Sequence, residues 1–149
     1  MQVSRVQIPL GPLYIMGNKK SHKEEKLRSN LIENIASLKR KNYLLIVEGD
    51  KDKKALEKIG LKNIFVINKT GVSLYSRIEE IKSMIGKKGK CVILTDFDKK
   101  GRKIYSIIKE ELLKDGIKMD NSFRDLLIRQ NISHVEGLAT FLKNLEERE

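Results

Sequence analysis

Apolar residues alternate along this chain between short continuous runs and longer helical stripes. The continuous runs lie at residues 43–47, 64–67 and 91–95, and the segment 132–135, bounded by Ile132 and Val135, is a further short candidate strand. A run of this length without polar interruptions is typical of a strand that is covered on both faces of a sheet. The stripes, with apolar positions three and four residues apart, predict amphipathic helices at residues 27–41, 52–59, 74–85, 101–113, 122–127 and 138–145. Strands and helices in this order predict an α/β fold in which right-handed crossovers connect parallel strands.

Local signals predict where several of these helices begin and end. Gly60, Gly86 and Gly116 follow three of the stripes, and glycine is the preferred residue just after a helix. Ser122 and Asp125 have the spacing of a capping box, which predicts that a helix begins there.

Acidic residues follow two of the predicted strands at the point where each strand ends. Glu48 comes directly after the run at 43–47, and Asp96 and Asp98 come after the run at 91–95. Ligands of open parallel sheets bind outside the carboxyl ends of the strands, so we expect the three carboxylates to meet at one edge. Carboxylates this close repel one another unless a cation lies between them, and hard oxygen ligands suit Mg²⁺ or Mn²⁺.

The chain also carries a large excess of positive charge, with 31 Lys and Arg against 20 Asp and Glu and a net charge of +11. This excess favours nucleic acid, other phosphate-bearing partners or an anionic surface. A lysine-rich solvated surface is the alternative, and charge alone does not decide between them. The helix expected after Asp98 offers free backbone N–H groups for a phosphate. The candidate phosphate-binding residues are Lys99, Lys100, Arg102, Lys103 and, after the second predicted strand, Lys69.

Further residues near the predicted strand ends are candidates for accessory roles. They are Asp52, Gly71, His134 and Glu136. His134 can contact substrate or tune a carboxylate, but a hydrogen-bonded structural role is the commoner one for such a histidine. Glu136 is either a fourth acidic group of the site or a favourable charge at a helix N-terminus. Arg77 is a further candidate for contact with phosphate.

The chain lacks the sequence signals of several classes of protein. No glycine-rich dinucleotide fingerprint and no Walker pattern follows the first predicted strand. Aromatic residues make up 5% of the chain and tryptophan is absent, so recognition should rest on phosphates and not on base stacking. Cys91 is the only cysteine, which fits a reducing cytoplasm. No apolar run reaches the roughly 18 residues of a membrane helix, and we therefore expect a cytoplasmic protein without a membrane partner.

The first fifteen residues differ in composition from the rest, because they contain both prolines and a single charged residue. We expect residues 1–15 to be a non-native or disordered leader, with Met16 as the true start. Residues 16–42 then form a basic N-terminal segment and helix, and residues 43–149 form the main domain.

The joint pattern of these motifs resembles the Toprim domain of bacterial primases, topoisomerases, old-family nucleases and the nuclease that matures 5S ribosomal RNA. The matching stretches are LIVEGDKD at 45–52, NKTG at 68–71 and VILTDFDKKGRK at 92–103, and the HVEG ending at 134–137 is similar to small stand-alone archaeal Toprim proteins. The resemblance implies a Rossmann-like Toprim fold, with a central parallel sheet of about four strands flanked by helices. It also implies that Glu48 binds metal or acts as general acid or base, and that Asp96 and Asp98 hold one or two Mg²⁺ ions, for which Mn²⁺ can substitute.

The resemblance leaves three functions open. The first is a Mg²⁺-dependent nuclease that acts on nucleic acid, on RNA in preference to DNA. The second is a primase-like nucleotidyl-transfer core that needs protein partners in an RNA-processing or replication complex, and the third is a non-catalytic, metal-stabilised nucleic-acid-binding module. A topoisomerase is not expected, because Tyr43, Tyr75 and Tyr105 fall within predicted strands or helices where a core role is expected.

Overall fold

The computed structural model describes residues 11–86 and 89–148, with side chains placed for residues 22–86 and 89–144. Its helices are α1 (Gly11–Lys41), α2 (Asp50–Lys58), α3 (Leu74–Ile85), α4 (Lys99–Lys114), α5 (Ser122–Arg129) and α6 (Val135–Arg148). Its strands are β1 (Leu44–Val47), β2 (Ile64–Val66), β3 (Lys90–Ile93) and β4 (Lys118–Met119). The expected alternation of strands and helices is therefore present.

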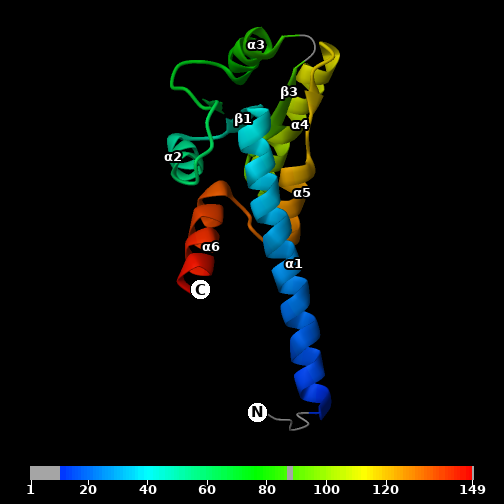
Figure 1. Cartoon of the computed structure of the whole chain (residues 1–149). Coiled ribbons are helices and arrows are strands. Elements are labelled where there is room, and N and C mark those ends of the chain that lie inside the picture. The colour runs from blue at the N-terminus through cyan, green and yellow to red at the C-terminus, as the bar shows by residue number, and fades with distance from the viewer. Residues whose placement is uncertain (1–10, 87–88, 149) are drawn as a thin grey trace.

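The four strands form one parallel sheet in the order β2-β1-β3-β4 (Figure 1). The register aligns Leu45 of β1 with Ile64 of β2 on one side and with Val92 of β3 on the other. The chain leaves β1 toward β2 and later returns to the opposite side of β1 as β3. The strand order thus reverses between β1 and β3, and a crevice at the carboxyl ends of two such strands is where open α/β sheets bind ligands. The α/β class and the parallel four-stranded sheet are confirmed.

Helices cover both faces of the sheet, which explains why the strand sequences are continuously apolar. On one face, Leu45 and Val47 of β1 pack with buried residues of α1, α2, α5 and α6. On the other face, Leu44 and Ile46 pack with buried residues of α3 and α4. Cys91 of β3 lies in this second core, where burial raises the pKa of its thiol to about 12. It is therefore a small apolar core residue and not a reactive thiol.

The fourth strand is not where the sequence predicted it. Residues 132–134 lie in the connection between α5 and α6 and Val135 is the first residue of α6, while β4 is the two-residue segment Lys118–Met119. The backbone N–H of Ile132 bonds to the carbonyl of Leu127 at 2.9 Å, and Asn131 before it has a φ of 58°. Ile132 and Val135 are nonetheless buried in the core. These two residues flank the exposed Ser133 and His134, so the buried pair alone suggested a short strand, and this caused the error.

Two further expectations about local structure were wrong. The start of α5 has no capping box at Ser122, because Asn121 is its N-cap residue and the backbone N–H of Ser122 bonds to Oδ1 of Asp120 at 3.0 Å. Tyr75 is not a core residue, because 58% of its surface is exposed on α3. The ring lies at the edge of the apolar face of α3, next to solvent.

Helix α1 begins earlier than the stripe from residue 27 predicted, and Figure 1 shows its N-terminal turns extending past the end of α6. It is anchored by Leu31, Ile35 and Leu38, which pack in the core with residues of α5. Residues 1–10 of the expected leader lie outside the described residues, and the division into leader, N-terminal segment and main domain stays a prediction. Among the helices that the structure describes, none is long and apolar enough to cross a membrane.

Candidate metal centre

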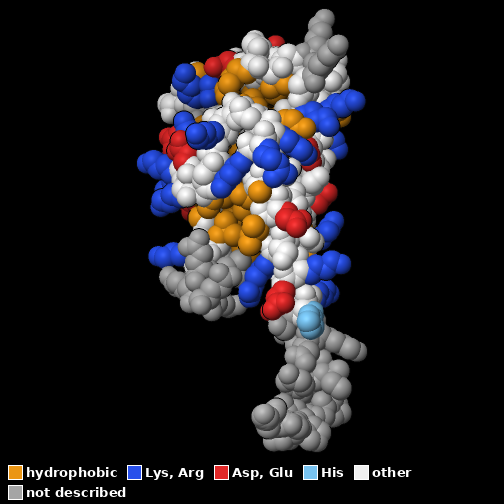
Figure 2. All heavy atoms as spheres, in the orientation of Figure 1, with side chains coloured by type: hydrophobic (Ala, Val, Ile, Leu, Met, Phe, Trp, Pro, Cys, Tyr) orange, Lys and Arg blue, Asp and Glu red, His pale blue; other side chains and the backbone are white. Residues whose placement is uncertain are grey.

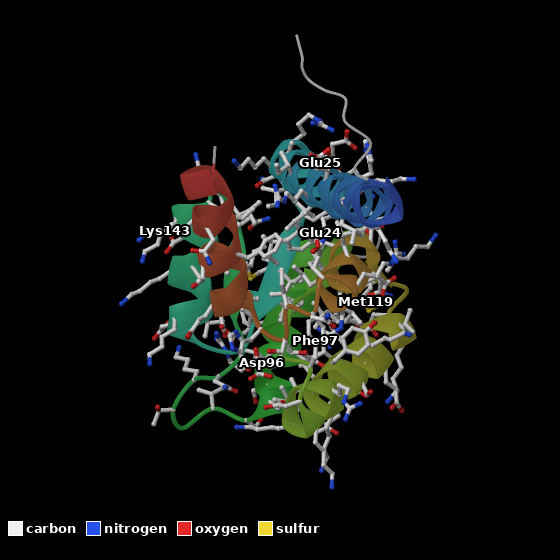
Figure 3. The ribbon with its side chains drawn as sticks, turned by 90° about the horizontal axis from the view of Figure 1, so that it is seen from below. Glu24, Glu25, Asp96, Phe97, Met119 and Lys143 are labelled. Atoms are coloured by element: carbon white, nitrogen blue, oxygen red, sulfur yellow. The ribbon has the colours of Figure 1, made fainter. Side chains whose placement is uncertain are left out.

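The carboxyl ends of β1 and β3 bring Glu48 and Asp96 together. Backbone hydrogen bonds continue beyond both strands, from Leu94 N–H to the Ile46 carbonyl at 2.7 Å and from Asn68 N–H to the Glu48 carbonyl at 3.1 Å. These bonds fix the backbone of Glu48 between two neighbouring segments. In Figure 3, Asp96 and Phe97 lie side by side near the first turn of α6, and the Phe97 N–H bonds to the Ser133 carbonyl at 3.1 Å.

Two carboxylate oxygens at this place are buried and have no hydrogen-bond partner. They are Oε1 of Glu48 and Oδ1 of Asp96. A buried polar atom without a partner costs about 1–3 kcal/mol, and more when it is charged. Such an atom in a native protein calls for a bound ion or water, and a cation suits two carboxylates best.

The pKa values of three carboxyl groups are raised, first by burial and then by the charges of neighbouring carboxylates. Burial raises the pKa of Glu48 above its usual range, and the neighbouring charges of Asp96, Asp98 and Asp52 raise it further. The pKa of Asp96 is raised by burial and then by the charge of Asp52. Burial also raises the pKa of Asp52, and Glu136 adds to this effect. These five acidic residues therefore act on one another at one edge of the sheet.

Three helices begin at this edge, and each holds a site residue by a hydrogen bond from a glycine N–H. The Gly49 N–H before α2 bonds to Oδ2 of Asp52 at 3.0 Å, and the Gly101 N–H in α4 bonds to Oδ1 of Asp98 at 2.7 Å. The Gly137 N–H in α6 bonds to Nδ1 of His134 at 3.1 Å. These bonds orient Asp52, Asp98 and His134, and the three helix N-termini place partial positive charge around the carboxylates.

His134 thus has the structural role that is commoner for such residues, as the acceptor at the start of α6. The same position brings it close to the acidic cluster, because His134 is among the groups that act to lower the pKa of Asp52 and of Asp96. Glu136 acts in the opposite direction on both groups. The structure therefore brings His134, Glu136 and Asp52 together with Asp96, while Gly71 lies in an exposed turn after β2 with a φ of 78°.

Gly101 explains the glycine of the TDFDKKG motif. A Cβ atom at this position would lie 2.0 Å from the backbone carbonyl oxygen of Asp96. The hydroxyl of Thr95 also donates to the Gly101 carbonyl at 2.9 Å. The motif therefore packs the first turn of α4 directly on the backbone of the residue that bears the carboxylate.

The donor set fits a hard divalent cation, although its ligands are not gathered into a finished site. Among the described residues, no three His, Cys, Asp or Glu side chains are placed together as a ready metal-binding group. Glu48 and Asp96 nevertheless offer buried, unpartnered oxygens that would coordinate such an ion. Oxygen-only donors of this kind suit Mg²⁺ or Mn²⁺. The ligand set Glu48, Asp96 and Asp98 remains a prediction.

The candidate phosphate-binding residues lie at the same edge of the sheet. Lys99, Lys100, Arg102 and Lys103 occupy the exposed first turn and a half of α4, whose N-terminus faces the carboxylates. Lys69 is exposed in the loop after β2, beside a shallow hollow of about 320 Å³. Contact of these side chains with phosphate stays a prediction.

Arg77 does not have the expected role. It is buried, donates to the backbone carbonyls of Val66 and Ile67, and pairs with Glu80 at 2.9 Å. Its guanidinium also lies 4.2 Å from the centre of the Phe65 ring. Arg77 therefore fixes the carboxyl end of β2 from inside and is not available to a phosphate.

Arg124 is a residue of the site that sequence reasoning missed. It is 5% exposed, and its Nη1 donates to the carbonyls of Thr95 at 2.8 Å and of Ile93 at 3.2 Å. Its guanidinium lies between the rings of Phe97 and Tyr105, 4.4 and 4.2 Å from their centres. Arg124 thus binds the backbone that leads into Asp96. The signal that could have revealed it was an arginine within the apolar stripe of the predicted helix at 122–127.

Comparisons with known proteins agree with this geometry. The chain is 33% identical to a UPF0292 protein of Methanocaldococcus jannaschii, over 66% of this chain and 77% of that protein. It is 28% identical to a UPF0292 protein of Methanosarcina acetivorans, over 83% of this chain and 85% of that protein. A solved structure described as a putative protein from Aquifex aeolicus superposes with a TM-score of 0.61 and 33% identity, over 72% of this chain and 94% of that chain.

The Toprim domain matches residues 43–124, which hold β1 to β4 and both acidic motifs. Toprim domains bind divalent metal ions and take part in metal-dependent chemistry of nucleic acids. With the sheet order, the paired acidic strand ends and this match, the chain belongs to the Toprim domain family, and it is similar to the small stand-alone UPF0292 proteins of archaea.

Proposed function

We propose that this protein is a small Mg²⁺-dependent nuclease that cleaves phosphodiester bonds of structured RNA. The observation that carries the proposal is the pair of buried, unpartnered oxygens of Glu48 and Asp96 beside three helix N-termini. The oxygens would hold a cation, and the helix ends and the lysines of α4 would hold the phosphate. The groups that would bind the metal and the groups that would bind the phosphate therefore lie side by side, as phosphodiester chemistry requires.

Each residue of the centre has a distinct part in this proposal. Glu48, Asp96 and Asp98 would hold the metal, and a bound divalent ion supplies stabilisation of negative charge on the phosphoryl oxygens. In the metal-free protein, burial and the charge of Asp96 raise the pKa of Glu48. Glu48 would also act as the general acid or base of the reaction. Arg124 would keep the Asp96 backbone in place without contacting the substrate.

RNA is the preferred substrate class in this proposal because of how the surface can recognise it. The chain has a net charge of +11 and few aromatic residues. Helical RNA is recognised mainly by its shape and through phosphate and 2′-hydroxyl contacts, which need no aromatic platform. A strongly basic surface that contacts phosphates is therefore compatible with structured RNA.

Single-turnover assays test the proposal. Wild type and Asp96→Asn are incubated with end-labelled hairpin RNA, 5S precursor RNA and duplex DNA, with Mg²⁺ or Mn²⁺, and primer synthesis is measured in parallel. We expect metal-dependent cleavage of RNA by wild type and loss of cleavage in Asp96→Asn. Glu110→Gln, an exposed carboxylate of α4, is the matched control and should cleave like wild type. Primer products without cleavage would replace the nuclease by a primase-like core with protein partners.

A non-catalytic nucleic-acid-binding module is the second candidate. One observation favours it, namely that the described side chains contain no finished group of three metal ligands. A binding module would hold RNA or DNA with a salt-dependent affinity and show no turnover on any substrate of the panel. Asp96→Asn would then bind as tightly as wild type, and metal would change stability only.

A further inference from the structure

Helices α2 and α6 enclose a groove that the metal centre does not use. The two helices make close contact through small residues, with Ala55 buried on α2 and Ala139 half-buried on α6. Two adjoining hollows of about 350 and 310 Å³ lie along this contact. They share Lys58, Ala139 and Thr140 in their walls, so they form one continuous groove, here termed the α2/α6 groove.

The walls of the α2/α6 groove are basic. Lys51, Lys54 and Lys58 line it from α2 and Lys143 lines it from α6. Figure 2 shows Lys and Arg side chains along the left edge of the molecule, over α2, and Figure 3 shows Lys143 projecting from α6 on the side of α2. Among the ion pairs of the described residues, none involves Lys51, Lys54 or Lys58.

The lysines Lys51, Lys54 and Lys58 are spaced three and four residues apart, so they lie on one face of α2 and line the groove together. Like charges at this spacing repel, while Asp50 and Glu57, four residues before and three residues after Lys54, act in the opposite direction. An anion bound in the groove would contact all three lysines and relieve their repulsion.

The groove leads directly to the candidate metal centre. Both helices begin at that centre, and the walls of the groove start with Lys51 on α2 and Glu136 on α6. Glu136 raises the pKa of Asp52 and Asp96, which places it at the edge of the acidic cluster. Lys58 and Lys143 lie at the other end. The groove is thus a basic path of about 10 Å, estimated from seven residues of helix at 1.5 Å each.

We propose that the α2/α6 groove binds the sugar–phosphate backbone of one nucleic-acid strand and directs it to the metal centre. This inference rests on the proposed function and adds the path of the substrate. A length of about 10 Å accommodates about three nucleotides at the 3.4 Å rise of a helical strand. An acidic protein segment is a poorer fit, because a protein interface needs a larger apolar centre than these two hollows provide.

Binding of a fluorescent twelve-nucleotide single strand, as RNA and as DNA, tests the proposal by anisotropy over a range of salt concentrations. The test variant replaces Lys51, Lys54 and Lys58 by Gln. The matched control variant replaces Lys62, Lys90 and Lys118 by Gln, because these lysines are exposed at the amino ends of β2, β3 and β4, the opposite edge of the sheet. Both variants lose the same charge, so long-range attraction falls equally in both.

We expect the groove variant to bind more weakly than the control and to have a flatter salt dependence. The slope of log affinity against log salt should fall by about 0.7 for each lost phosphate contact, hence by about 2 for three contacts. Equal affinities and slopes in the two variants would overturn the proposal, and so would normal nucleic-acid binding combined with loss of binding to a poly-glutamate peptide. If circular dichroism shows that a triple variant is unfolded, Lys54→Glu and Lys118→Glu replace the two triple variants. Lys54→Glu is then expected to bind more weakly than Lys118→Glu.

The same preparations separate this inference from the proposed function. Asp96→Asn keeps every groove lysine, so its affinity should fall as steeply with salt as that of wild type while it cleaves nothing. If wild type cleaves RNA but the groove variant binds and cleaves like the control, only the groove assignment fails. If wild type never cleaves but the groove variant alone loses binding, the groove assignment stands and the nuclease does not.

Discussion

Gly101 of α4 lies so close to Asp96 that a Cβ atom on the glycine would stand 2.0 Å from the Asp96 carbonyl oxygen. No side chain can make this approach, because the obstacle is backbone and cannot rotate away. We therefore expect Gly101→Ala to destabilise the protein by about 1–3 kcal/mol, the usual cost of overpacking. Urea unfolding followed by circular dichroism measures this change.

Gly49 provides the control for this substitution. A Cβ at Gly49 would meet its nearest neighbour, Oδ2 of Asp52, only at 4.0 Å. Gly49→Ala should therefore unfold close to the wild-type midpoint. Equal stability of the two alanine variants would contradict the packing of α4 on the Asp96 backbone.

Arg124 is expected to be essential for the geometry of the centre although it is not a predicted metal ligand. Arg124→Lys keeps the charge but loses the planar stacking between Phe97 and Tyr105 and cannot reproduce the donor geometry to the Thr95 carbonyl. We expect a loss of about 2–3 kcal/mol of unfolding free energy, the range for hydrogen bonds that involve a charged group. Mg²⁺ affinity, measured by titration calorimetry on the folded variant, should also fall.

Arg129 on the same helix is the control, because it is exposed in the last turn of α5. Arg129→Lys should change neither stability nor metal affinity. If Arg124→Lys lowered stability while Mg²⁺ bound with wild-type affinity, Arg124 would be a packing residue only.

The metal-free protein should lose stability as the pH rises through the weakly acidic range. The pKa values of Glu48, Asp52 and Asp96 are raised in the folded protein, mainly by burial. Between the unfolded pKa of about 4 and these raised values, the folded state holds more protons than the unfolded state, so unfolding free energy falls with increasing pH. Above the raised pKa values the loss is complete.

Asp96→Asn should reduce this pH dependence, because the amide carries no charge to repel Glu48 or Asp52. At neutral pH and in the presence of a chelator, Asp96→Asn should be more stable than wild type. Urea midpoints between pH 4 and pH 8 measure both effects. Glu110→Gln, with the same charge change on exposed α4, should follow the wild-type curve. A wild-type curve that rises over this range would show that repulsion among these carboxylates does not govern the pH dependence.

Mg²⁺ should restore the stability that wild type loses through repulsion among these carboxylates. An ion that binds only the folded state at a hundred times its Kd adds about 2.7 kcal/mol to the free energy of unfolding. We expect this stabilisation in wild type and its absence in Asp96→Asn, measured as a shift of the urea midpoint. Ca²⁺ is a useful comparison because it prefers larger and more flexible oxygen sites. An equal Mg²⁺ effect in wild type and Asp96→Asn would place the ion elsewhere.

Much of the fold and part of the site could be predicted because their signals are local. The continuous apolar runs at 43–47 and 91–95 predicted buried parallel strands, and the acidic residues that follow them predicted which edge carries the centre. The clustering of Glu48 and Asp96 was predicted because ligands of open parallel sheets bind outside the carboxyl ends of the strands. The order of the strands in the sheet was not predicted.

Features that depend on how distant segments pack against one another were not predictable in the same way. The short β4 has two residues, too few to show any pattern, while Ile132 and Val135 are buried core residues that lie outside any strand. Arg77 was a candidate for contact with phosphate and Arg124 was not singled out, since arginines are rarely buried. Their burial depends on carbonyls and aromatic rings that other segments supply.

The sharpest expectation for catalysis concerns Glu48. Glu48→Gln is nearly isosteric and keeps one oxygen for the metal, but it cannot exchange a proton as a carboxyl group does. If Glu48 serves as general acid or base, single-turnover cleavage should fall at least about 100-fold while the affinity for a labelled RNA stays at the wild-type value. A variant that cleaves within a few-fold of wild type would assign Glu48 to metal binding or structure alone and leave the proton transfer to another group.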